Sequence, residues 1–472
     1  MIFNILSHEW TTHRQSKLQI ILLTLMISLL LLAMFIHWNQ QQALIQSQQI
    51  WQEKADNFWR NQPDRHPHRV AHYGHVVLRP TAPLSFIDAG ISPYVGNYLF
   101  LEAHRQNSSA IRNTLLSPTI MKLGYPSVST LMIILWPLIL IIIGYGSFSH
   151  ERESERLKWL LSMGATIWQL FVGKSLLFII YTILLLAIIA TVTLFFLIFN
   201  NTLSLTVVIE LFMLLIVYGL YSAFWIMLIF ILSYRVQSST TSLAGLLLTW
   251  LFTVVLIPKL SVELSENIYQ TPDRLNLHIA LEKAVKAIGD SHNPDDPYFT
   301  DFKSQVLKKY GVKSIAELPV NWKGLVMAEG ERIQSEIYKT HFQAITDQYQ
   351  QQQQVSAWFG FLSPGIAIHQ LSQILTINDR ISNHHFELAA EAFRYQLIQS
   401  LNEIQTHHID YENNSTQKAS QSFWQQMGLF NYQHPTLNER VNQASISWLI
   451  LCFWVAVLLS GIIYFKKQWY LP

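Results

Sequence analysis

Six apolar runs dominate the chain and limit what it can fold into. They lie at residues 18–38, 127–148, 174–199, 205–232, 242–257 and 446–465. A helix needs about 20 apolar residues to cross a bilayer core of about 30 Å, and these runs approach or exceed that length. The composition agrees, because 50% of the residues are hydrophobic and 13% are charged, roughly half the charged fraction of a soluble domain. The sequence therefore predicts an all-α polytopic membrane protein with six transmembrane helices.

Basic residues gather at one face of these predicted spans. They are Arg14, Lys17, Arg152, Arg156, Lys158, Lys174, Arg235, Lys466 and Lys467. Because cytoplasmic loops carry an excess of Lys and Arg, we expect both termini in the cytoplasm and the chain in a bacterial inner membrane. The predicted cytoplasmic parts are a helix in the membrane interface at 1–17, an amphipathic helix at 149–173 and a tail at 466–472.

Two large insertions then fall on the extracytoplasmic side. They occupy residues 39–126 and 258–445. The second is predicted to be largely helical, because 275–288 and 322–354 carry spaced apolar residues and no proline. A further helix is expected at 384–404, so this insertion should be a helical domain outside the membrane.

The sequence lacks the motifs of several enzyme classes. It has no G-x-x-x-x-G-K-[ST] phosphate loop, no H-E-x-x-H zinc motif and no readable Ser-His-Asp or Cys-His set. The formal net charge of +2 gives no basic field for nucleic acid. The single cysteine, Cys452, lies in an apolar run, so no disulfide within the chain is possible. We therefore expect no ATP hydrolysis by this chain, no cofactor and no nucleic-acid partner.

The segment between the second and third runs has a distinctive pattern. It reads SHERESERLKWLLSMGATIWQLFVGK, with alternating acids and bases, a leucine-rich stretch, a small-residue turn and a Gly-Lys pair before the next span. This pattern resembles permeases of type-2 ABC exporters, although Leu157-Lys158 stands where the family usually has Gly-Thr. The matching residues are Glu151, Arg152, Glu153, Glu155, Arg156, Leu160, Leu161, Ser162, Gly173 and Lys174, with Gly164 in the turn.

This resemblance implies a function and a set of partners. It implies the membrane subunit of an ATP-driven exporter, in which 149–173 is the coupling helix that contacts a separate ABC ATPase. ATP and Mg are then expected on that ATPase. A second permease, identical or homologous, is expected to complete the pathway, with polar groups such as Tyr218, Ser222 and Thr249 lining the shared seam.

The insertions narrow the resemblance to one subfamily of these permeases, which has a large uncharacterised extracytoplasmic domain. Residues 66–107 carry the first motif, and residues 361–403 carry a second that includes Phe393–Gln396. The motif residues of the first stretch are His66, His68, His72, Tyr73, His75, Arg79, Glu102 and His104. The resemblance does not name a substrate.

The histidines of the first motif allow two interpretations. Imidazole is a common ligand of Zn, Cu and Ni, and on a helix His68, His72 and His75 would share a face. However, Pro67 and Gly74 argue against a helix there. Hydrogen bonding within a small domain without disulfides is therefore the favoured interpretation, and we assign no metal site from the sequence.

Glu210 in the fourth run is a candidate for a transport role, because an acid within a span is functional by default. The run is longer than a bilayer requires, so Glu210 could instead stand in water at the outer headgroups. For the whole chain, a membrane-anchored sensor or assembly scaffold is the main alternative to a permease. An intramembrane enzyme is disfavoured because no catalytic set is present. An ATPase gene beside this one would favour the exporter, and a kinase gene the sensor.

Overall fold

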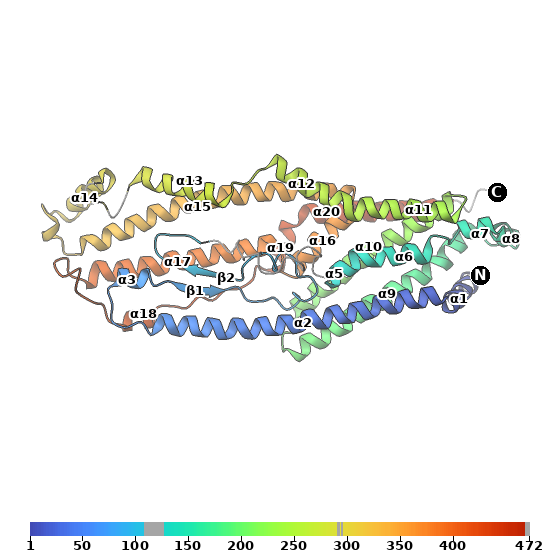
Figure 1. Cartoon of the computed structure of the whole chain (residues 1–472), viewed down its shortest axis with the longest axis horizontal. Coiled ribbons are helices and arrows are strands. Elements are labelled where there is room, and N and C mark those ends of the chain that lie inside the picture. Colours follow the sequence, from blue (N-terminus) through green and yellow to red (C-terminus); the bar gives the residue numbers. More distant parts are fainter. Residues whose placement is uncertain (108–126, 290–292, 294–295, 468–472) are drawn as a thin grey trace.

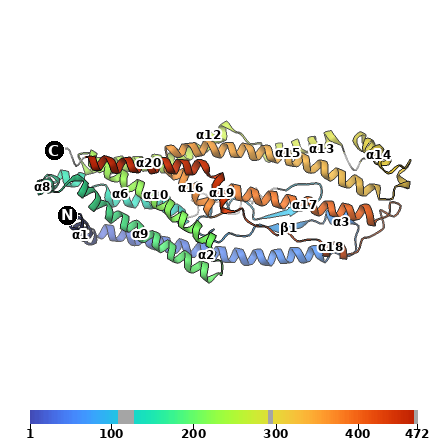
Figure 2. The same ribbon diagram turned by 180° about the vertical axis from the view of Figure 1, so that it is seen from behind.

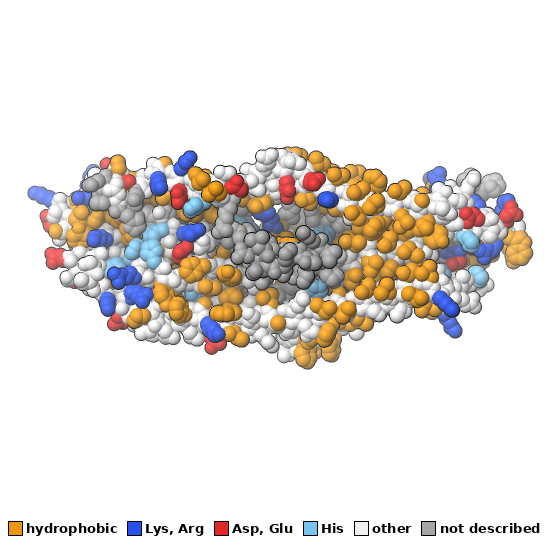
Figure 3. Space-filling view, in the orientation of Figure 1, with side chains coloured by type: hydrophobic (Ala, Val, Ile, Leu, Met, Phe, Trp, Pro, Cys, Tyr) orange, Lys and Arg blue, Asp and Glu red, His pale blue; other side chains and the backbone are white. Residues whose placement is uncertain are grey.

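The chain forms a long rod of helices (Figure 1). The structure is a computed structural model that describes residues 1–107, 127–289, 293 and 296–467. It is 75% helical. Figure 3 shows that apolar side chains cover the part of the rod over α6, α9 and α11, while charged side chains collect toward its two ends. This distribution is that of a protein whose part over α6, α9 and α11 lies in lipid.

Six helices of the described residues are long and apolar enough to cross a membrane, which confirms the predicted fold class. Four spans are single helices: α2 (Lys17–Arg60), α9 (Ile167–Phe199), α10 (Leu205–Arg235) and α20 (Ser445–Lys467). The second span is a run of four elements, α5 (Val128–Thr130), η2 (Leu131–Leu135), α6 (Trp136–Gly144) and α7 (Ser149–Glu153). The fifth span is a run of three, α11 (Ser239–Trp250), η3 (Leu251–Leu256) and α12 (Ile257–Ile268). Helices α1 (Ile2–Gln15) and α8 (Arg156–Ser162) lie at one end of the rod, where α20 also finishes (Figures 1 and 2).

Helix α2 is far longer than the predicted span at 18–38. It has 44 residues, which corresponds to about 66 Å at 1.5 Å per residue. Residues 39–60 include seven Gln, with Ala, Leu, Lys, Glu and Arg among the others, and contain neither Gly nor Pro. These residues favour helix in water as well as in lipid, so the helix continues where the apolar run ends. Half of α2 therefore extends beyond the bilayer as a stalk.

Two of the spans contain a π-helical turn directly before a proline. The turn η2 precedes Pro137, which lacks the backbone N–H that an α-helix needs. The Tyr221 hydroxyl donates to the carbonyl of Ile133 at 3.0 Å, and Trp250 Nε1 donates to the carbonyl of Ile134 at 3.1 Å. Neighbouring spans thus satisfy backbone acceptors at the irregular turn, as a helix in lipid requires.

The fifth span also continues beyond its predicted end at 257. The π-helical turn η3 precedes Pro258, and α12 extends the helix to Ile268. Only 6% of its most apolar window is buried against the rest of the chain. This span therefore lies at the edge of the bundle, and many of its apolar side chains are exposed.

The other end of the rod, which we call the distal region, is built around two long antiparallel helices. These are α15 (Trp322–Trp358) and α17 (Arg380–His408), which lie side by side (Figures 1 and 2). The remaining elements are α3 (Pro67–Ala71), β1 (His75–Leu78), β2 (Tyr98–Leu101), α13 (Arg274–Ile288), α14 (Pro297–Tyr310), η4 (Ile315–Glu317), η5 (Phe359–Phe361), α16 (Pro364–Leu375), α18 (Ser422–Gln426) and α19 (Leu437–Gln443). Strands β1 and β2 pair antiparallel, with His75 opposite Leu101. Helices occur at all three predicted places.

The largest hydrophobic core joins the spans to α16, which contacts both α10 and α20. Within this core, Tyr218 and Ser222 are fully buried. The Tyr218 hydroxyl lies 2.7 Å from Ser372 Oγ, which in turn donates to Asp88 Oδ2 at 2.5 Å. The expectation that Tyr218 and Ser222 line a seam with a second permease is therefore wrong. Tyr218 joins α10 to α16 within one chain, and the Ser222 hydroxyl donates to the Tyr218 carbonyl inside α10 at 2.8 Å.

Candidate functional site

The charged segment expected as one amphipathic helix folds as two short helices. Helix α7 ends at Glu153, and α8 begins at Arg156 after Glu155 adopts a left-handed φ of 59°. A non-glycine residue in this region costs about 1 kcal/mol or more. At this break between the two helices, the Ser154 hydroxyl donates a hydrogen bond to the carbonyl of His150 at 2.8 Å. A second left-handed residue, Gly164 with φ 88°, ends α8 and turns the chain into α9.

Lys174 lies at the centre of this end of the molecule and is almost completely buried. Its side chain is 4% exposed, and Nζ lies 2.5 Å from Glu9 Oε1 and 2.8 Å from Glu151 Oε1. Because burying a charge requires paired and hydrogen-bonded partners, these two carboxylates fix the position of the ammonium. The triad connects α1, α7 and α9. Glu151 and Lys174 are thus internal anchors.

Gly173 has a related structural role. A Cβ at this position would lie 2.7 Å from Cγ2 of Ile5 and 3.2 Å from the carbonyl oxygen of Ile2. A side chain would therefore push α1 away from α9. At the start of the third span, Gly173 therefore lets α1 pack closely against α9, and Lys174 pairs with Glu9 of α1.

Arg152 and Glu153 attach α7 to the turn between α10 and α11. Arg152 Nη1 donates to the carbonyl of Val236 at 2.5 Å, and its guanidinium lies over the ring of Tyr234. The Glu153 carboxylate accepts the backbone N–H of Ser239 at 2.9 Å. Ser239 is the first residue of α11, where helix N–H groups lack partners within the helix. Helix α7 is therefore joined to three neighbouring spans.

One set of residues at this end faces outward, and we call it the tip surface. It comprises Glu155, Arg156, Lys158, Trp159 and Met163, all of which are exposed. Trp159 is 70% exposed and Met163 is 64% exposed. Lys158 Nζ lies 3.0 Å from Glu155 Oε1. A tryptophan and a methionine among charges of both signs are typical of the centre of a protein–protein interface.

The predicted coupling residues therefore separate into two groups. Glu155 and Arg156 belong to the tip surface, whereas Leu160 is half-buried and packs against the main core. Trp159 and Met163 were missed by the sequence analysis. Their spacing of four residues, opposite the buried Leu157, is the signal that could have identified them as one helix face.

Glu210 stands neither in water nor at a free position in the membrane. It is 3% exposed and forms an ion pair with Arg440, which lies in α19 and is 2% exposed. Arg440 Nη1 also donates to the carbonyl of Ile374 at 2.7 Å. The interpretation of Glu210 as a solvated acid is corrected. It connects α10 to α16 and α19, and removing one partner of such a pair costs about 3–5 kcal/mol.

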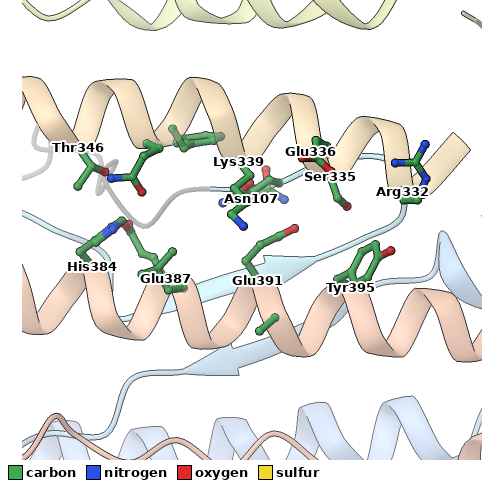
Figure 4. A pocket seen from close by; sticks show the side chains of 15 residues that line it. Asn107, Arg332, Ser335, Glu336, Lys339, Thr346, His384, Glu387, Glu391 and Tyr395 are labelled. Carbon is green, nitrogen blue, oxygen red and sulfur yellow. The ribbon is translucent and has the colours of Figure 1, made fainter. Parts of the chain in front are cut away.

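A pocket of about 400 Å³ lies between α15 and α17 in the distal region (Figure 4). Its lining mixes charged, polar and apolar side chains, among them Arg332, Lys339, Phe342, Glu387, Glu391 and Tyr395. Figure 4 shows Glu391 rising from α17 toward Lys339 and Glu336 on α15. Burial raises the pKa of Glu391, against the effect of the neighbouring Arg394. The pocket could hold a small ligand with both polar and apolar parts.

Arg394 forms two ion pairs behind this pocket, one of them with the pocket residue Glu391. Arg394 Nη1 lies 2.6 Å from Glu331 Oε1, and Nη2 lies 2.7 Å from Glu391 Oε1. Arg394 also donates to the carbonyl of Glu102 at 3.2 Å. The two motif stretches found in the sequence thus meet here, because Arg394 belongs to the second and Glu102 to the first.

The first motif contains a short helix, α3, although Pro67 and Gly74 had indicated that no helix would form there. Helix α3 begins at Pro67, and the His66 ring caps it by accepting the backbone N–H of His68 at 3.2 Å. Proline is favoured at the first helical position, and the helix ends before Gly74. Burial lowers the pKa of His66. The helix brings His68 and His72 together, with their Nε2 atoms 3.2 Å apart.

The other motif residues are distributed around this helix. His75 lies in β1, away from the pair, with Nε2 3.3 Å from Asp56 of α2. Arg79 donates to Ser92 at 2.9 Å and to Asn383 of α17 at 3.3 Å. The Tyr73 ring stacks on Phe58 with a centroid distance of 4.8 Å. These three residues fasten the first insertion to α2 and α17.

Two protein-family models match the chain. Residues 83–256 match the model described as ABC-2 family transporter protein, which covers three of the six spans, part of a fourth, and the segment from α7 to α8. Residues 278–433 match the model described as a domain of unknown function, DUF3526, which covers most of the distal region. No curated protein matches the chain.

Proposed function

We propose that this chain, of which residues 83–256 match an ABC-2 transporter family, is a permease of that type and forms the membrane subunit of an exporter driven by a separate ATPase. The family implies association with an ABC ATPase and with the membrane. The sequence contains no phosphate loop, so the energy for transport would come from that other chain. The substrate would move out of the cytoplasm or out of the inner membrane.

The observation that carries this proposal is the tip surface and its attachment. Exposed Trp159 and Met163 lie beside Glu155, Arg156 and Lys158 at the end of the rod that also carries α1. Interfaces with a partner protein combine aromatic anchors and charges in this way. An ATPase bound here would contact the permease at a point outside the lipid.

The attachment of α7 also suggests how movement could be transmitted. Lys174 connects α7 to α1 and α9, while Arg152 and Glu153 connect it to the turn between α10 and α11. A partner that displaced α7 and α8 would therefore move several spans together. Buried ion pairs transmit such a displacement well because breaking them is costly.

The charges near the tip surface also suggest how the chain is oriented in the membrane. We propose that the tip surface faces the cytoplasm of a bacterial cell, because the flanking Lys and Arg residues obey the positive-inside rule. Both termini would then be cytoplasmic, and the distal region would stand outside the inner membrane. The pocket between α15 and α17 would belong to that extracytoplasmic part.

The test is binding of the cognate ABC ATPase to the permease in nanodiscs. We expect the Trp159→Ala and Glu155→Lys changes together to weaken binding by about 2 kcal/mol, roughly thirtyfold. Both side chains are exposed, so the permease should fold normally. Permease-stimulated ATP hydrolysis should fall in parallel.

The control is a charge change at the opposite end of the rod. Lys308→Glu and Lys309→Glu alter two exposed residues of α14 and should leave ATPase binding unchanged. Unchanged binding of the tip-surface variant, measured beside this control, would show that the ATPase binds elsewhere.

A further inference from the structure

Three histidine side chains from two separate segments meet at the surface of the distal region. His68 lies in α3, His72 directly follows it, and His104 lies in the turn after β2. One ring nitrogen of each lies within 4.8 Å of those of the other two. Figure 3 shows histidine side chains gathered on this face near the place of α3 in Figure 1.

Helix α3 sets the first two ligand atoms. Residues four apart share a face of a helix, and the His68 and His72 Nε2 atoms are 3.2 Å apart. In a tetrahedral zinc site with Zn–N bonds of about 2.05 Å, neighbouring nitrogens lie roughly 3.3 Å apart. The pair therefore already has the separation that one metal ion requires.

The third histidine is oriented by groups behind it. His104 adopts a left-handed φ of 62°, and its backbone N–H donates to Glu331 Oε2 at 2.9 Å. Its Nδ1 lies 3.0 Å from Gln334 Oε1 and 3.4 Å from Glu331 Oε2. These acceptors favour a proton on Nδ1, which leaves Nε2 of the neutral ring as the nitrogen with a lone pair.

The arrangement behind His104 is itself typical of metal sites. A histidine that ligates a metal usually donates its other ring N–H to a carboxylate or carbonyl group. Here the carboxylate is that of Glu331, which is fully buried and held by Arg394 at 2.6 Å. A strained backbone, a fixed carboxylate and a pair of imidazoles thus converge on one point.

We propose that His68, His72 and His104 bind a divalent transition-metal ion of the zinc type. Imidazole nitrogens suit Zn, Cu and Ni, whereas Mg and Ca prefer oxygen ligands. His72 is exposed, so a fourth position is open to water, as in other three-histidine sites. The ion joins α3 to the turn after β2 and, through Glu331, to α15. This inference stands independently of the transport proposal.

Zinc binding to the purified full chain in nanodiscs tests the site. Titration calorimetry should give one high-affinity Zn²⁺ per chain, and His72→Asn or His68→Asn should each weaken it at least tenfold, since each removes one of three ligands. His278→Asn is the matched control, because His278 is an exposed helical histidine beside a carboxylate, Glu282. This control should bind Zn²⁺ like the wild type.

The residue behind the site provides a second variant. Gln334→Leu keeps all three imidazoles and removes an acceptor from His104 Nδ1, so it should weaken Zn²⁺ binding by about 10- to 100-fold. Zn²⁺ should also raise the thermal unfolding temperature of the wild type but not that of His72→Asn. Zinc affinity in His72→Asn equal to that of the wild type, or no stoichiometric binding by the wild type, would overturn the proposal.

Discussion

Lys174 is enclosed by carboxylates from two other helices, and only 4% of its side chain is exposed. Removing the ammonium would leave the half-buried carboxylates of Glu9 and Glu151 without the lysine that pairs with both. Buried pairs lose about 3–5 kcal/mol when one partner is removed, because the remaining charge lacks compensation. The residue should therefore matter first for the folded state and only through it for coupling to a partner.

We expect Lys174→Met to lower the free energy of unfolding by about 3–5 kcal/mol. Thermal or denaturant unfolding in nanodiscs measures this loss. The triple variant Lys174→Met, Glu9→Gln and Glu151→Gln should regain most of it, because no unpaired charge is left. Lys158→Met at the exposed tip surface is the control and should change stability by less than about 0.5 kcal/mol. Equal effects of Lys174→Met and Lys158→Met would contradict the anchoring role.

At the residue scale, the sequence singled out charged residues but did not show which charges they pair with. Glu151 and Lys174 were selected by family resemblance, yet the third member of the triad, Glu9, is 165 residues away from Lys174. Likewise, Glu210 is paired with Arg440, 230 residues later. A single sequence does not reveal which distant charges meet, because that depends on how the helices pack. The sequence therefore did not distinguish the residues of 149–174 that are exposed from those that are buried.

At the element scale, the segment between α18 and α19 was not predicted at all. Its side chains alternate, with Phe430, Tyr432 and His434 turned inward and Asn431 and Gln433 exposed. The Tyr432 ring lies 5.3 Å from those of Phe386 and His434. The segment is thus extended and held by its rings rather than by a strand partner. Period-two alternation was its only signal in the sequence.

His434 makes this segment sensitive to pH. Burial, with Arg79, Arg440 and His385 nearby, lowers its pKa to about 4, whereas an unfolded histidine has a pKa of about 6.5. The unfolded chain therefore takes up a proton that the folded chain excludes. The resulting stability is complete above pH 6.5 and is lost as the pH falls toward 4.

We expect the unfolding temperature of the purified permease to fall between pH 7 and pH 5, because protonation favours the unfolded chain by about 1.4 kcal/mol per pKa unit. His434→Gln should make this dependence shallower by removing the titrating ring. His278→Gln, which changes an exposed histidine of α13, should leave it as in the wild type. A pH dependence that is the same in all three proteins would assign it to other groups.

The elements themselves were well predicted where apolar periodicity was strong and poorly delimited elsewhere. All six spans and the helices α13, α15 and α17 were expected, but α2 was predicted to stop near Trp38 and continues to Arg60. Hydropathy locates the edge of the bilayer, not the end of a helix. The break at Glu155 was missed for another reason, since a left-handed conformation is uncommon for a glutamate and apolar periodicity does not indicate it.

At the scale of the whole molecule, the spans cover one another unequally. In the second and fourth spans, 67% and 61% of the most apolar window is buried, compared with 6% in the span from Ser239 to Ile268. Exposed side chains on that span include Leu248, Leu251, Phe252 and Val255. Thr249, the third residue expected at a seam between permeases, also lies on this span. The surface least covered by its own chain is therefore the best candidate for contact with another.

We expect two permease chains in the active complex, meeting along the span from Ser239 to Ile268. Native mass measurement in nanodiscs should give two permeases for each set of ATPases. In a background with Cys452→Ser, which removes the only native cysteine, Phe252→Cys should form a disulfide between chains. Ile183→Cys, about equally exposed on α9, is the control and should form no disulfide between chains because it faces lipid.

The possible outcomes separate the number of chains from the position of the seam. Crosslinking through Ile183→Cys but not Phe252→Cys, in a particle with two permeases, would place the seam on α9. A stable and active particle with one permease chain would refute the pairing itself. We expect pairing because the described part of one chain fills its own centre with Tyr218, Trp225 and Phe230, all fully buried. A conduit for cargo therefore needs a second set of helices, and the uncovered fifth span is where that set can pack.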